Sequence, residues 1–577
     1  MNRLLRGVLS HWQLYEPDTD IQFDASVPLP IAQALHRRGV KTASDLEAFL
    51  YPDAYPFSEI NALPDAEQAL ELLHYAVQRQ KKIFIVGDYD VDGTTAATLL
   101  YTFLEALGYT SNNVKVHLPN RLSEGYGISA YAVQRAIEFG AELFIAVDCG
   151  TKDIASLERL KAAGMRIIVL DHHRVDSSTT FPPADAFVNP QRPDSHYHNR
   201  YLSAGALTYR LLAAYQKRYG QPEDWEGVDL GAISLLADIM PLVGENRALV
   251  QLGLRRLRSS LRPGIAKLME IARLTPEHLT YSRSIVFQLV PRLNASGRLR
   301  DARYTFYLLS ASAYSDKVRE VAEYLNSLNQ YRQTLQESAY QEALKQLEAR
   351  YPGIMTGEIP PPSALVVVGK NWHKGVIGLV ASKLVERFYR PTVVFIAAED
   401  RLIGSARSPA EVPLYEVLNT YCRPYMERFG GHDRAAGLTI RAENLESFTR
   451  EFQAGCATYE PLVPLDFIDS EISPEMLADT DFVSWCDRFE PTGPQNDAPR
   501  FLLRGLRYCD GVEGNKLCFA TSTARLYEAY PEGVHLERLK TYLNQHKGNS
   551  LSIVFTPRLS SANKVYLRLR DVLIDND

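Results

Sequence analysis

Short apolar runs between residues 83 and 170 constrain the fold most strongly, because a helical pattern separates each run from the next. The runs are Ile83–Val86, Val114–Leu118, Leu143–Val147 and Ile167–Leu170. The helix-like segments between them are 94–107, 130–139 and 154–163. Strands that alternate with helices form βαβ units, in which the strands are parallel. The sequence therefore predicts an α/β domain built on a parallel sheet.

The first apolar run ends in three carboxylates at alternate positions. The stretch GDYDVDG places Asp88, Asp90 and Asp92 directly after the expected strand and before a helix. Ligands of open α/β sheets bind at the carboxyl ends of the strands, and crowded carboxylates repel one another unless a cation lies between them. A solvated acidic turn is one alternative. A calcium loop is another, but the glutamate that it needs is replaced by Leu99. The segment favours a metal site.

Three further segments end in potential metal ligands. LFIAVDCG ends near Asp148, IIVLDHH ends in Asp171, His172 and His173, and SLLADIMPL places Asp238 after a helical stretch. Taken singly, each could be an ordinary capping or helix-terminal residue. Together with the first motif they supply enough ligands for two divalent ions ~3.5–4 Å apart, as in phosphoryl transfer. Carboxylates with few imidazoles suit Mn²⁺ or Mg²⁺ better than Zn²⁺.

The remaining chain divides into further units. Residues 313–350 contain no Gly or Pro and repeat apolar positions at helical spacing. We interpret them as a connector helix rather than a coiled-coil partner, because Arg332 interrupts the apolar stripe. A second α/β unit follows, and alternating residues near the C-terminus are typical of strands. The predicted units are a helical lead-in packed on the first domain (1–80), the first domain (81–312), the connector (313–352), the second domain (363–456) and a β-rich third domain (461–577).

Composition excludes several classes of protein. The 577 residues carry a formal net charge of −6, so any DNA path must be a local basic strip. The stretch 292–303, with four arginines, is a better candidate for that strip than the basic helix 252–263. We expect no signal peptide and no membrane span, because no apolar run approaches ~20 residues. The six cysteines show no CxxC spacing, which predicts reduced thiols in a cytoplasmic protein.

The motifs resemble those of a known family. GDYDVDG, VDCG, LDHH and ADIMPL, in this order, resemble the four motifs of the DHH phosphoesterase superfamily. The stretches LPNRLSEGYG, VPRLNASGRL, WHKGVIGLVASKL, GSARS and GGHDRAAG are similar to the RecJ single-stranded-DNA-specific exonuclease family. This resemblance covers nearly the whole chain. It implies a parallel-sheet DHH domain joined by a long helix to a smaller α/β DHHA1 domain, with a β-rich, OB-like C-terminal domain.

The resemblance also implies roles for particular residues. Asp148 would bridge both ions, and His173 would contact the scissile phosphate. The residues at metal-ligand positions are Asp88, Asp90, Asp92, Asp148, His172 and Asp238, of which Asp90, Asp148 and His172 join His173 as catalytic residues. The residues at substrate-binding positions are Arg121, Arg298, Ser405, Arg407, Gly431 and His432. The glycine-rich segments around the last four can offer backbone N–H groups, and Arg407 can offer a bidentate fork for phosphate.

The chain departs from the family pattern at a few positions. Cys149 stands where the second motif usually has Asn, and Ser234 and Leu235 stand where the fourth usually has Gly-Thr. The usual Pro-Phe-Gly-x-Gly-Asn-Pro pattern of the third domain is eroded in PTGPQNDAPRF. These departures concern substrate positioning, and no metal ligand is lost.

The expected function is 5′→3′ hydrolysis of single-stranded DNA to 5′-mononucleotides with two metal ions, in DNA repair and recombination. The resemblance implies single-stranded DNA as substrate, a monomer, and a helicase or single-strand-binding protein as candidate partner. Two alternatives stay open. One is a small-substrate phosphodiesterase of the same superfamily, acting on short oligonucleotides or cyclic dinucleotides. The other is a catalytically inactive scaffold that binds DNA.

Overall fold

The structure is a computed structural model that describes residues 4–16, 23, 26–175, 180–509, 516–521, 525–531, 536–560 and 564–574. Its first domain is built on a five-stranded parallel sheet with the order β4-β3-β5-β6-β7. The strands are β3 (Ile83–Val86), β4 (Val114–His117), β5 (Leu143–Val147), β6 (Arg166–Leu170) and β7 (Ala186–Val188). The four strands predicted from the apolar runs are therefore present.

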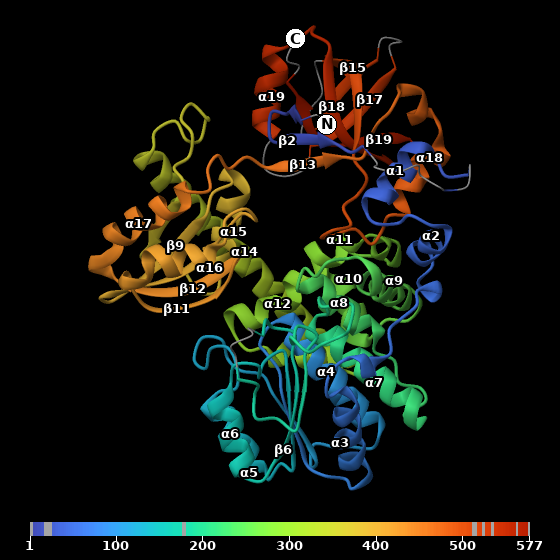
Figure 1. Cartoon of the computed structure of the whole chain (residues 1–577), viewed down its shortest axis with the longest axis vertical. Helices are drawn as coiled ribbons and strands as arrows, with labels where there is room; N and C mark the ends of the chain where they lie inside the picture. Colours follow the sequence, from blue (N-terminus) through green and yellow to red (C-terminus); the bar gives the residue numbers. More distant parts are fainter. Residues whose placement is uncertain are drawn as a thin grey trace.

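Helices cover both faces of this sheet, because its central strands are apolar on both sides. Every residue of β3 and β5 is buried. The helices α4 (Val91–Ala106) and α7 (Ala204–Tyr219) lie on one face, and α5 (Ala130–Phe139) and α6 (Ile154–Ala162) lie on the other (Figure 1). The remaining helices of the domain are α3 (Ala66–Gln78), α8 (Val228–Ala237), α9 (Gly244–Ser259), α10 (Pro263–Ile271), α11 (Ser282–Ser284), α12 (Val290–Leu299) and α13 (Arg303–Ser310).

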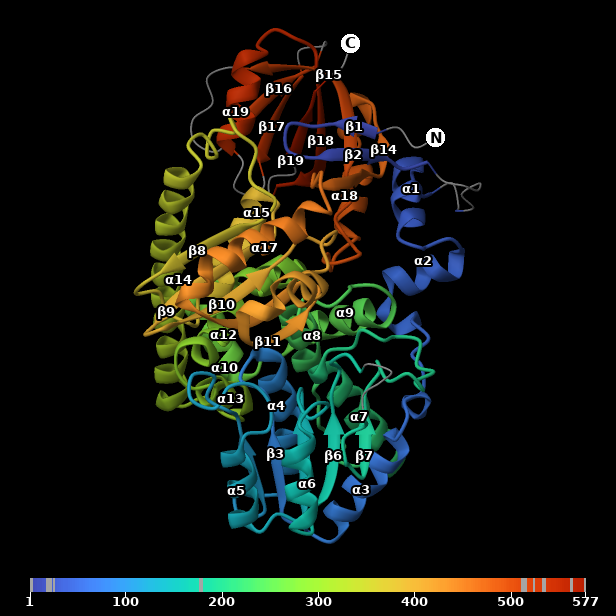
Figure 2. The same ribbon diagram turned by 60° about the vertical axis from the view of Figure 1, so that its left-hand side comes forward.

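The long helix α14 (Asp316–Arg350) has 35 residues and belongs to two domains. The Ser315 hydroxyl caps its first turn by accepting from the Val318 amide. Its first half buries Val321 and Leu325 in the core of the first domain, beside α10, α12 and α13 (Figure 2). Its second half buries Ala339, Tyr340, Ala343 and Leu347 against β8 and α15 of the second domain. One continuous helix therefore ties the two domains together.

The second domain carries a mixed five-stranded sheet with the order β11-β12-β10-β9-β8. Only β8 and β9 are parallel, and the other pairs are antiparallel. The strands are β8 (Leu365–Gly369), β9 (Thr392–Ala398), β10 (Arg401–Arg407), β11 (Met426–His432) and β12 (Ala435–Arg441). The helices are α15 (Ile377–Phe388), α16 (Leu414–Val417) and α17 (Leu445–Ala457).

The third domain is a closed barrel of the OB-like kind, as the sequence predicted. Pairing of β15 with β18 closes a sheet that otherwise runs β15-β16-β17-β19-β18. The strands are β14 (Ser470–Glu471), β15 (Phe501–Cys509), β16 (Leu517–Ala520), β17 (Leu526–Pro531), β18 (Leu551–Leu559) and β19 (Val565–Leu573). The helices are α18 (Thr480–Asp487) and α19 (Leu536–Gln545).

The lead-in differs from the prediction of a helical segment packed on the first domain. Residues 4–14 form the strands β1 (Leu4–Arg6) and β2 (His11–Leu14), and β2 pairs with β13 (Leu465–Ile468). The helices α1 (Leu29–Arg37) and α2 (Ala43–Leu50) bury residues in the core of the third domain. The helix α3, with Ile60 and Leu63 before it, buries residues in the core of the first domain. The physical reason is that the apolar residues of this segment pack on the third domain, which lies more than 400 residues further along the chain.

Arg247 joins the first domain to the third. Its buried guanidinium donates to the backbone carbonyls of residues 488–491 at 2.7–3.1 Å and lies 3.7 Å from the centroid of the Phe49 ring. A guanidinium with several fixed donors suits this cluster of carbonyls, whereas a lysine could satisfy fewer of them. Across the described residues, no helix is both long and apolar enough to span a bilayer.

Candidate metal centre

The carboxylates predicted as ligands meet at one edge of the first sheet. β3 is the first strand of the domain, and its successors β4 and β5 lie on opposite sides of it. The strand order therefore reverses between β3 and β5, and ligands of open α/β sheets bind at such a switch point. Asp88 follows β3, Asp148 follows β5, and His172 follows β6 by two residues. The backbone turns sharply at Asp148, which has a φ of 60°.

Five carboxylates and two imidazoles gather there in three overlapping groups. Within each group one potential ligand atom from each residue lies within 4.8 Å of the others. The groups are Asp88, Asp90 and Asp148; Asp92, His172 and Asp238; and Asp148, His172 and His173. All six residues predicted as metal ligands are therefore brought together. Because residues are shared between groups, the arrangement suits two neighbouring ions better than one.

His172 lies at the centre of the second group. Its Nε2 is 3.2 Å from Asp148 Oδ1, 3.5 Å from Asp92 Oδ2 and 3.7 Å from Asp238 Oδ2. Burial lowers the pKa of His172, although the carboxylate of Asp92 opposes this shift. A neutral imidazole is the form that binds a metal ion. His172 is thus suited to share a cation with the surrounding carboxylates.

The electrostatics of the carboxylates call for a cation. Burial, and then repulsion from neighbouring carboxylates, raises the pKa of Asp148 and of Asp238 well above the usual range. The pKa of Asp88 is raised well above that range by burial and by Asp90, whose own pKa is raised by burial and by Asp92. Groups this close cannot all ionise without a counter-charge.

The donor atoms fit a hard divalent cation. Asp88 Oδ1 is buried and has no hydrogen-bond partner among the described residues. A buried carboxylate oxygen without a partner is costly, and a cation would satisfy it. Oxygen donors with one or two imidazoles, and no thiolate aimed into the group, favour Mn²⁺ or Mg²⁺ over Zn²⁺.

Asp92 is fixed by the start of α7. Its two carboxylate oxygens accept from the amides of Ala204 and Gly205, each at 2.8 Å. The Ser234 hydroxyl also donates to Asp92. Ser234 is one of the departures from the family pattern, and its hydroxyl keeps a hydrogen-bonding contact with a predicted ligand. At Gly205 a Cβ would lie 2.5 Å from Ser234 Oγ, so a larger residue would displace that contact.

Asp171 has a role that the sequence did not reveal. It is buried and accepts from the Thr151 amide at 3.1 Å, the Thr151 hydroxyl at 2.6 Å and the His172 amide at 2.8 Å. It also holds His173 Nδ1 at 2.7 Å. Burial would lower the pKa of His173, but Asp171 and its hydrogen bond raise that pKa to about 9. Asp171 therefore orients a protonated His173 instead of serving as a ligand.

The other departures lie behind the site. Cys149 is buried with the apolar residues under α5 and α6, and burial raises the pKa of its thiol well above the usual range. Leu235 is fully buried in the core between α4, α7 and α8. Neither side chain is among the potential ligands. These two substitutions therefore change packing behind the centre rather than its polar face.

Four arginines converge beside the carboxylates, and we call them the arginine cluster: Arg121, Arg298, Arg332 and Arg407. Burial, together with the positive charges of the other three, lowers the pKa of Arg298 to about 10, while Asp90 opposes this shift. Arg121 also lies 5.2 Å from the centroid of the Tyr89 ring. In the sequence, Tyr89 stands between the predicted ligands Asp88 and Asp90. Arg332 comes from α14 and was predicted only as an interruption of its apolar stripe. Like charges held together in this way indicate an anion-binding site.

The second domain brings its predicted residues to the same place. Arg407 ends β10 and His432 ends β11, and both pair with Ala435 on β12. The Arg407 guanidinium donates to Ser405 Oγ at 3.1 Å. Burial lowers the pKa of His432, and the charges of Arg407 and His173 add to that effect, so the two domains face each other here. Gly431 has a φ of 153°, and a Cβ there would meet Ala435 O at 2.3 Å.

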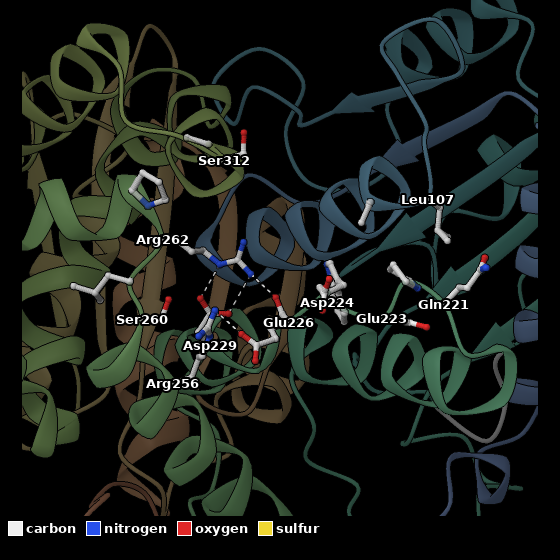
Figure 3. A pocket seen from close by; sticks show the side chains of 16 residues that line it. Leu107, Gln221, Glu223, Asp224, Glu226, Asp229, Arg256, Ser260, Arg262 and Ser312 are labelled. Atoms are coloured by element: carbon white, nitrogen blue, oxygen red, sulfur yellow. Dashed lines mark hydrogen bonds and ion pairs between the residues drawn. The ribbon is translucent and has the colours of Figure 1, made fainter.

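A separate pocket lies away from these clusters. It has a volume of about 780 Å³ and lies where the loop 221–226 meets α9 and α10 (Figure 3). Arg262 Nε donates to Asp229 at 2.7 Å, and Arg256 pairs with Glu226. Because its central charges neutralise one another, this pocket is not the candidate active site.

The comparisons with known proteins agree with this geometry. Residues 82–235 match the DHH family, N-terminal domain, and residues 362–458 match the DHHA1 domain. The single-stranded-DNA-specific exonuclease RecJ of Salmonella typhimurium is 33% identical over 76% of this chain and 76% of its own length. The chain belongs to the RecJ family. The Bacillus subtilis RecJ exonuclease is also 33% identical, over 85% of this chain but only 61% of its own length.

A solved structure of the RecJ family extends the likeness to the whole fold. The crystal structure of Thermus thermophilus RecJ in complex with Mn²⁺ matches with a TM-score of 0.78 and 27% identity. The match covers 95% of this chain and 76% of the other. The shared fold thus includes the first, second and barrel domains.

Proposed function

We propose that this chain is a single-stranded-DNA-specific exonuclease that hydrolyses phosphodiester bonds with two divalent cations, Mn²⁺ or Mg²⁺. The observation that carries the proposal is that a cluster of carboxylates lies next to a cluster of arginines at the carboxyl edge of the first sheet. Membership of a family whose relatives are named as such exonucleases supports it. The RecJ structure with Mn²⁺ supports the choice of metal.

We assign the chain's own residues the following tasks. Asp148 would be shared between the ions, because it belongs to two of the three ligand groups. The other proposed ligands are Asp88, Asp90, Asp92, His172 and Asp238. When bound, the ions supply Lewis-acid stabilisation of the charge that develops on the phosphate. His173 would contact the scissile phosphate, and its Nδ1 lies 2.7 Å from Asp171 Oδ1, a contact that favours the protonated ring.

The bond that breaks joins phosphorus to the 3′-oxygen of the terminal nucleotide. Water adds to phosphorus and the 3′-oxygen leaves with a proton, so the departing product is a 5′-mononucleotide and the shortened strand keeps a 5′-phosphate. We assign 5′→3′ polarity on the likeness to the family. Ser405, Arg407, Gly431 and His432 would bind the terminal phosphate, since Arg407 offers a charged fork beside backbone N–H groups.

The arginine cluster supports a preference for single strands. The positive charge of Arg407, from the second domain, helps to lower the pKa of Arg298 in the first, so the two guanidinium groups lie near each other where the domains meet and would bind one phosphate backbone. A helicase that separates strands, or a single-strand-binding protein that holds them, is the class of partner that such a substrate implies. We expect binding to weaken as salt rises, because it depends on contacts with phosphates.

The test compares oligonucleotides labelled at the 5′ or the 3′ end with Mn²⁺ and with EDTA. We expect the 5′ label to appear at once as a mononucleotide and the 3′-labelled strand to shorten stepwise, with a blunt duplex resistant under identical salt. Comparable rates on the blunt duplex would contradict the single-strand assignment. Faster cleavage of cyclic dinucleotides would favour the small-substrate alternative, and no cleavage at all would favour the inactive scaffold.

A further inference from the structure

A second hollow of about 470 Å³ opens beside the arginine cluster, and we call it the tyrosine pocket. It lies between the loop that follows β4, the start of α13 and the first turns of α14. The residues that line it and carry the argument are Asn120, Arg300, Tyr304, Tyr307, Lys317 and Tyr324. None of them is among the residues assigned above to metal or terminal-phosphate binding.

The pocket offers aromatic faces. The Tyr304 and Tyr324 rings lie 4.8 Å apart, centroid to centroid, at an interplanar angle of 56°. Tyr304 is 38% exposed and Tyr307 is 39% exposed, although both belong to a helix that packs on the core. Tyrosines that expose their rings into a hollow can stack a planar ligand, and nucleobases stack on such rings without regard to sequence.

The rim of the pocket is positively charged. Arg303 is neutralised by Asp301 at 2.6 Å, and Lys317 is 3.7 Å from Glu320. Arg300 is exposed, and among the described residues no carboxylate lies within ion-pair distance of it. Its charge is felt nearby, because burial and then Arg300 lower the pKa of His373. Aromatic rings with a positive charge beside them suit a nucleobase that is attached to a phosphate.

Two of the pocket's residues, Asn120 and Arg300, lie within two positions of arginine-cluster residues along the chain. Arg298 lies two residues before Arg300 at the end of α12, and the charge of Asp90 acts to raise the pKa of Arg298. On the other side, the Asn120 amide donates to Arg300 O at 3.2 Å, and the next residue is Arg121 of the arginine cluster. A strand whose phosphate rests on Arg298 would therefore reach Arg300 with a following phosphate.

We propose that the tyrosine pocket is a stacking subsite for a base of the DNA strand that extends away from the metal centre. The proposal rests on the function assigned above and adds a determinant of substrate length. Strands too short to reach Tyr304 and Tyr307 gain nothing from the pocket, and longer strands gain a stacked base with a phosphate on Arg300.

The experiment measures kcat/KM with Mn²⁺ for 5′-phosphorylated oligothymidines of increasing length. For the wild type we expect a step of about tenfold at one length, in keeping with the stacking of one base. Tyr307→Ala should remove the step and leave cleavage of the dinucleotide unchanged, whereas Tyr307→Phe should keep it. Tyr314→Ala is the matched control, because Tyr314 is 60% exposed on the same segment but does not line the pocket.

An abasic site moved along the strand locates the stacked base. At one position it should lower wild-type kcat/KM about as much as Tyr307→Ala does, and it should cause no further loss in that variant. Equal sensitivity of wild type and Tyr307→Ala at every position would overturn the subsite. The proposed function would fail differently, since the wild type would then not cleave any of the strands.

Discussion

The metal centre and the arginine cluster lie side by side, but the first gathers negative charges and the second gathers positive ones. In the metal centre, burial and repulsion raise the pKa of Asp88, Asp148 and Asp238, which disfavours the charged forms. In the arginine cluster, burial lowers the pKa of Arg298 and of Arg407, and neighbouring arginines add to this effect. The charges of the two clusters offset each other only in part, because Arg121 acts to lower the pKa of Asp88 and Arg298 that of Asp90, yet both carboxyl pKa values stay raised. Cations at the carboxylates and anions at the arginines would relieve these two strains at adjacent positions.

The largest effect should follow from Asp148→Ala. We expect hydrolysis to fall by at least about a thousandfold, beyond the ten- to hundredfold typical of losing an outer partner of a metal ligand. The metal-free variant should unfold at a higher temperature than the wild type, by about 2–4 °C for each kcal/mol of repulsion removed. The measurements are single-strand turnover in saturating Mn²⁺ and thermal unfolding in EDTA.

The exposed carboxylate Asp224 provides the matched control, and Asp224→Ala should change neither quantity. If Asp148→Ala keeps substantial turnover, the carboxylates are not acting as one metal centre. If its metal-free form is less stable than the wild type, the repulsion inferred for the cluster is contradicted.

Asp171→Asn should reduce turnover by about ten- to hundredfold, as an orienting partner does. The carboxylate accepts several hydrogen bonds, and the amide group of Asn would place a donor against one of these donors. Asp185→Asn is the control, because Asp185 accepts from the Ile167 amide at the opposite end of β6. The measurement is kcat together with the Mn²⁺ dissociation constant. A loss confined to Mn²⁺ affinity would make Asp171 a ligand rather than an orienting residue.

The sequence predicts the ligands of the site better than the residues that orient them. Most of the carboxylates are predictable because they follow apolar runs, and strand ends in a parallel sheet share one edge, whereas Asp238 follows a helix. Asp171 lay in the same run, but its neighbours' amides and Thr151 decide its role, and those contacts depend on backbone geometry. Arg332 appears in the sequence only as a break in an apolar stripe, since Arg298, whose pKa it lowers, lies in a different helix.

The lead-in shows the same limit at the level of the fold. The strand β2 was missed because four residues of mixed polarity carry little periodicity, and its partner β13 lies about 450 residues away. Local patterns predict local elements well. They do not identify which distant surface a short segment covers.

Arg407→Ala tests the other cluster and should have a smaller effect. We expect the preference for a 5′-phosphorylated end over a 5′-hydroxyl end to drop by about tenfold, because charge-assisted contacts with phosphate contribute about 1.5–3 kcal/mol. Lysine should not restore it, since its ammonium lacks the planar fork. Arg401→Ala, at the far end of the same strand and paired with Glu427, is the control. An unchanged preference in Arg407→Ala would remove Arg407 from phosphate recognition.

The smallest effect separates the clusters by their protons. Because the carboxylates have raised pKa values without metal, protons compete with Mn²⁺, so affinity should fall as pH falls and binding should release protons. Arg298 keeps its proton up to about pH 10, so DNA binding should take up none through it between pH 7 and 8.5. Calorimetry in buffers of different ionisation enthalpy measures both. Proton release on DNA binding but not on Mn²⁺ binding would invert the comparison.

Counting the Mn²⁺ ions that bind to each chain tests the two-ion centre directly. Titration of Mn²⁺ into the metal-free chain, followed by calorimetry at pH 8, should show two ions per chain for the wild type. Asp148→Ala should bind at most one of them tightly, because it removes the one carboxylate that belongs to two groups. A wild-type stoichiometry of one, or two tight ions retained in Asp148→Ala, would contradict the account of a shared two-ion centre.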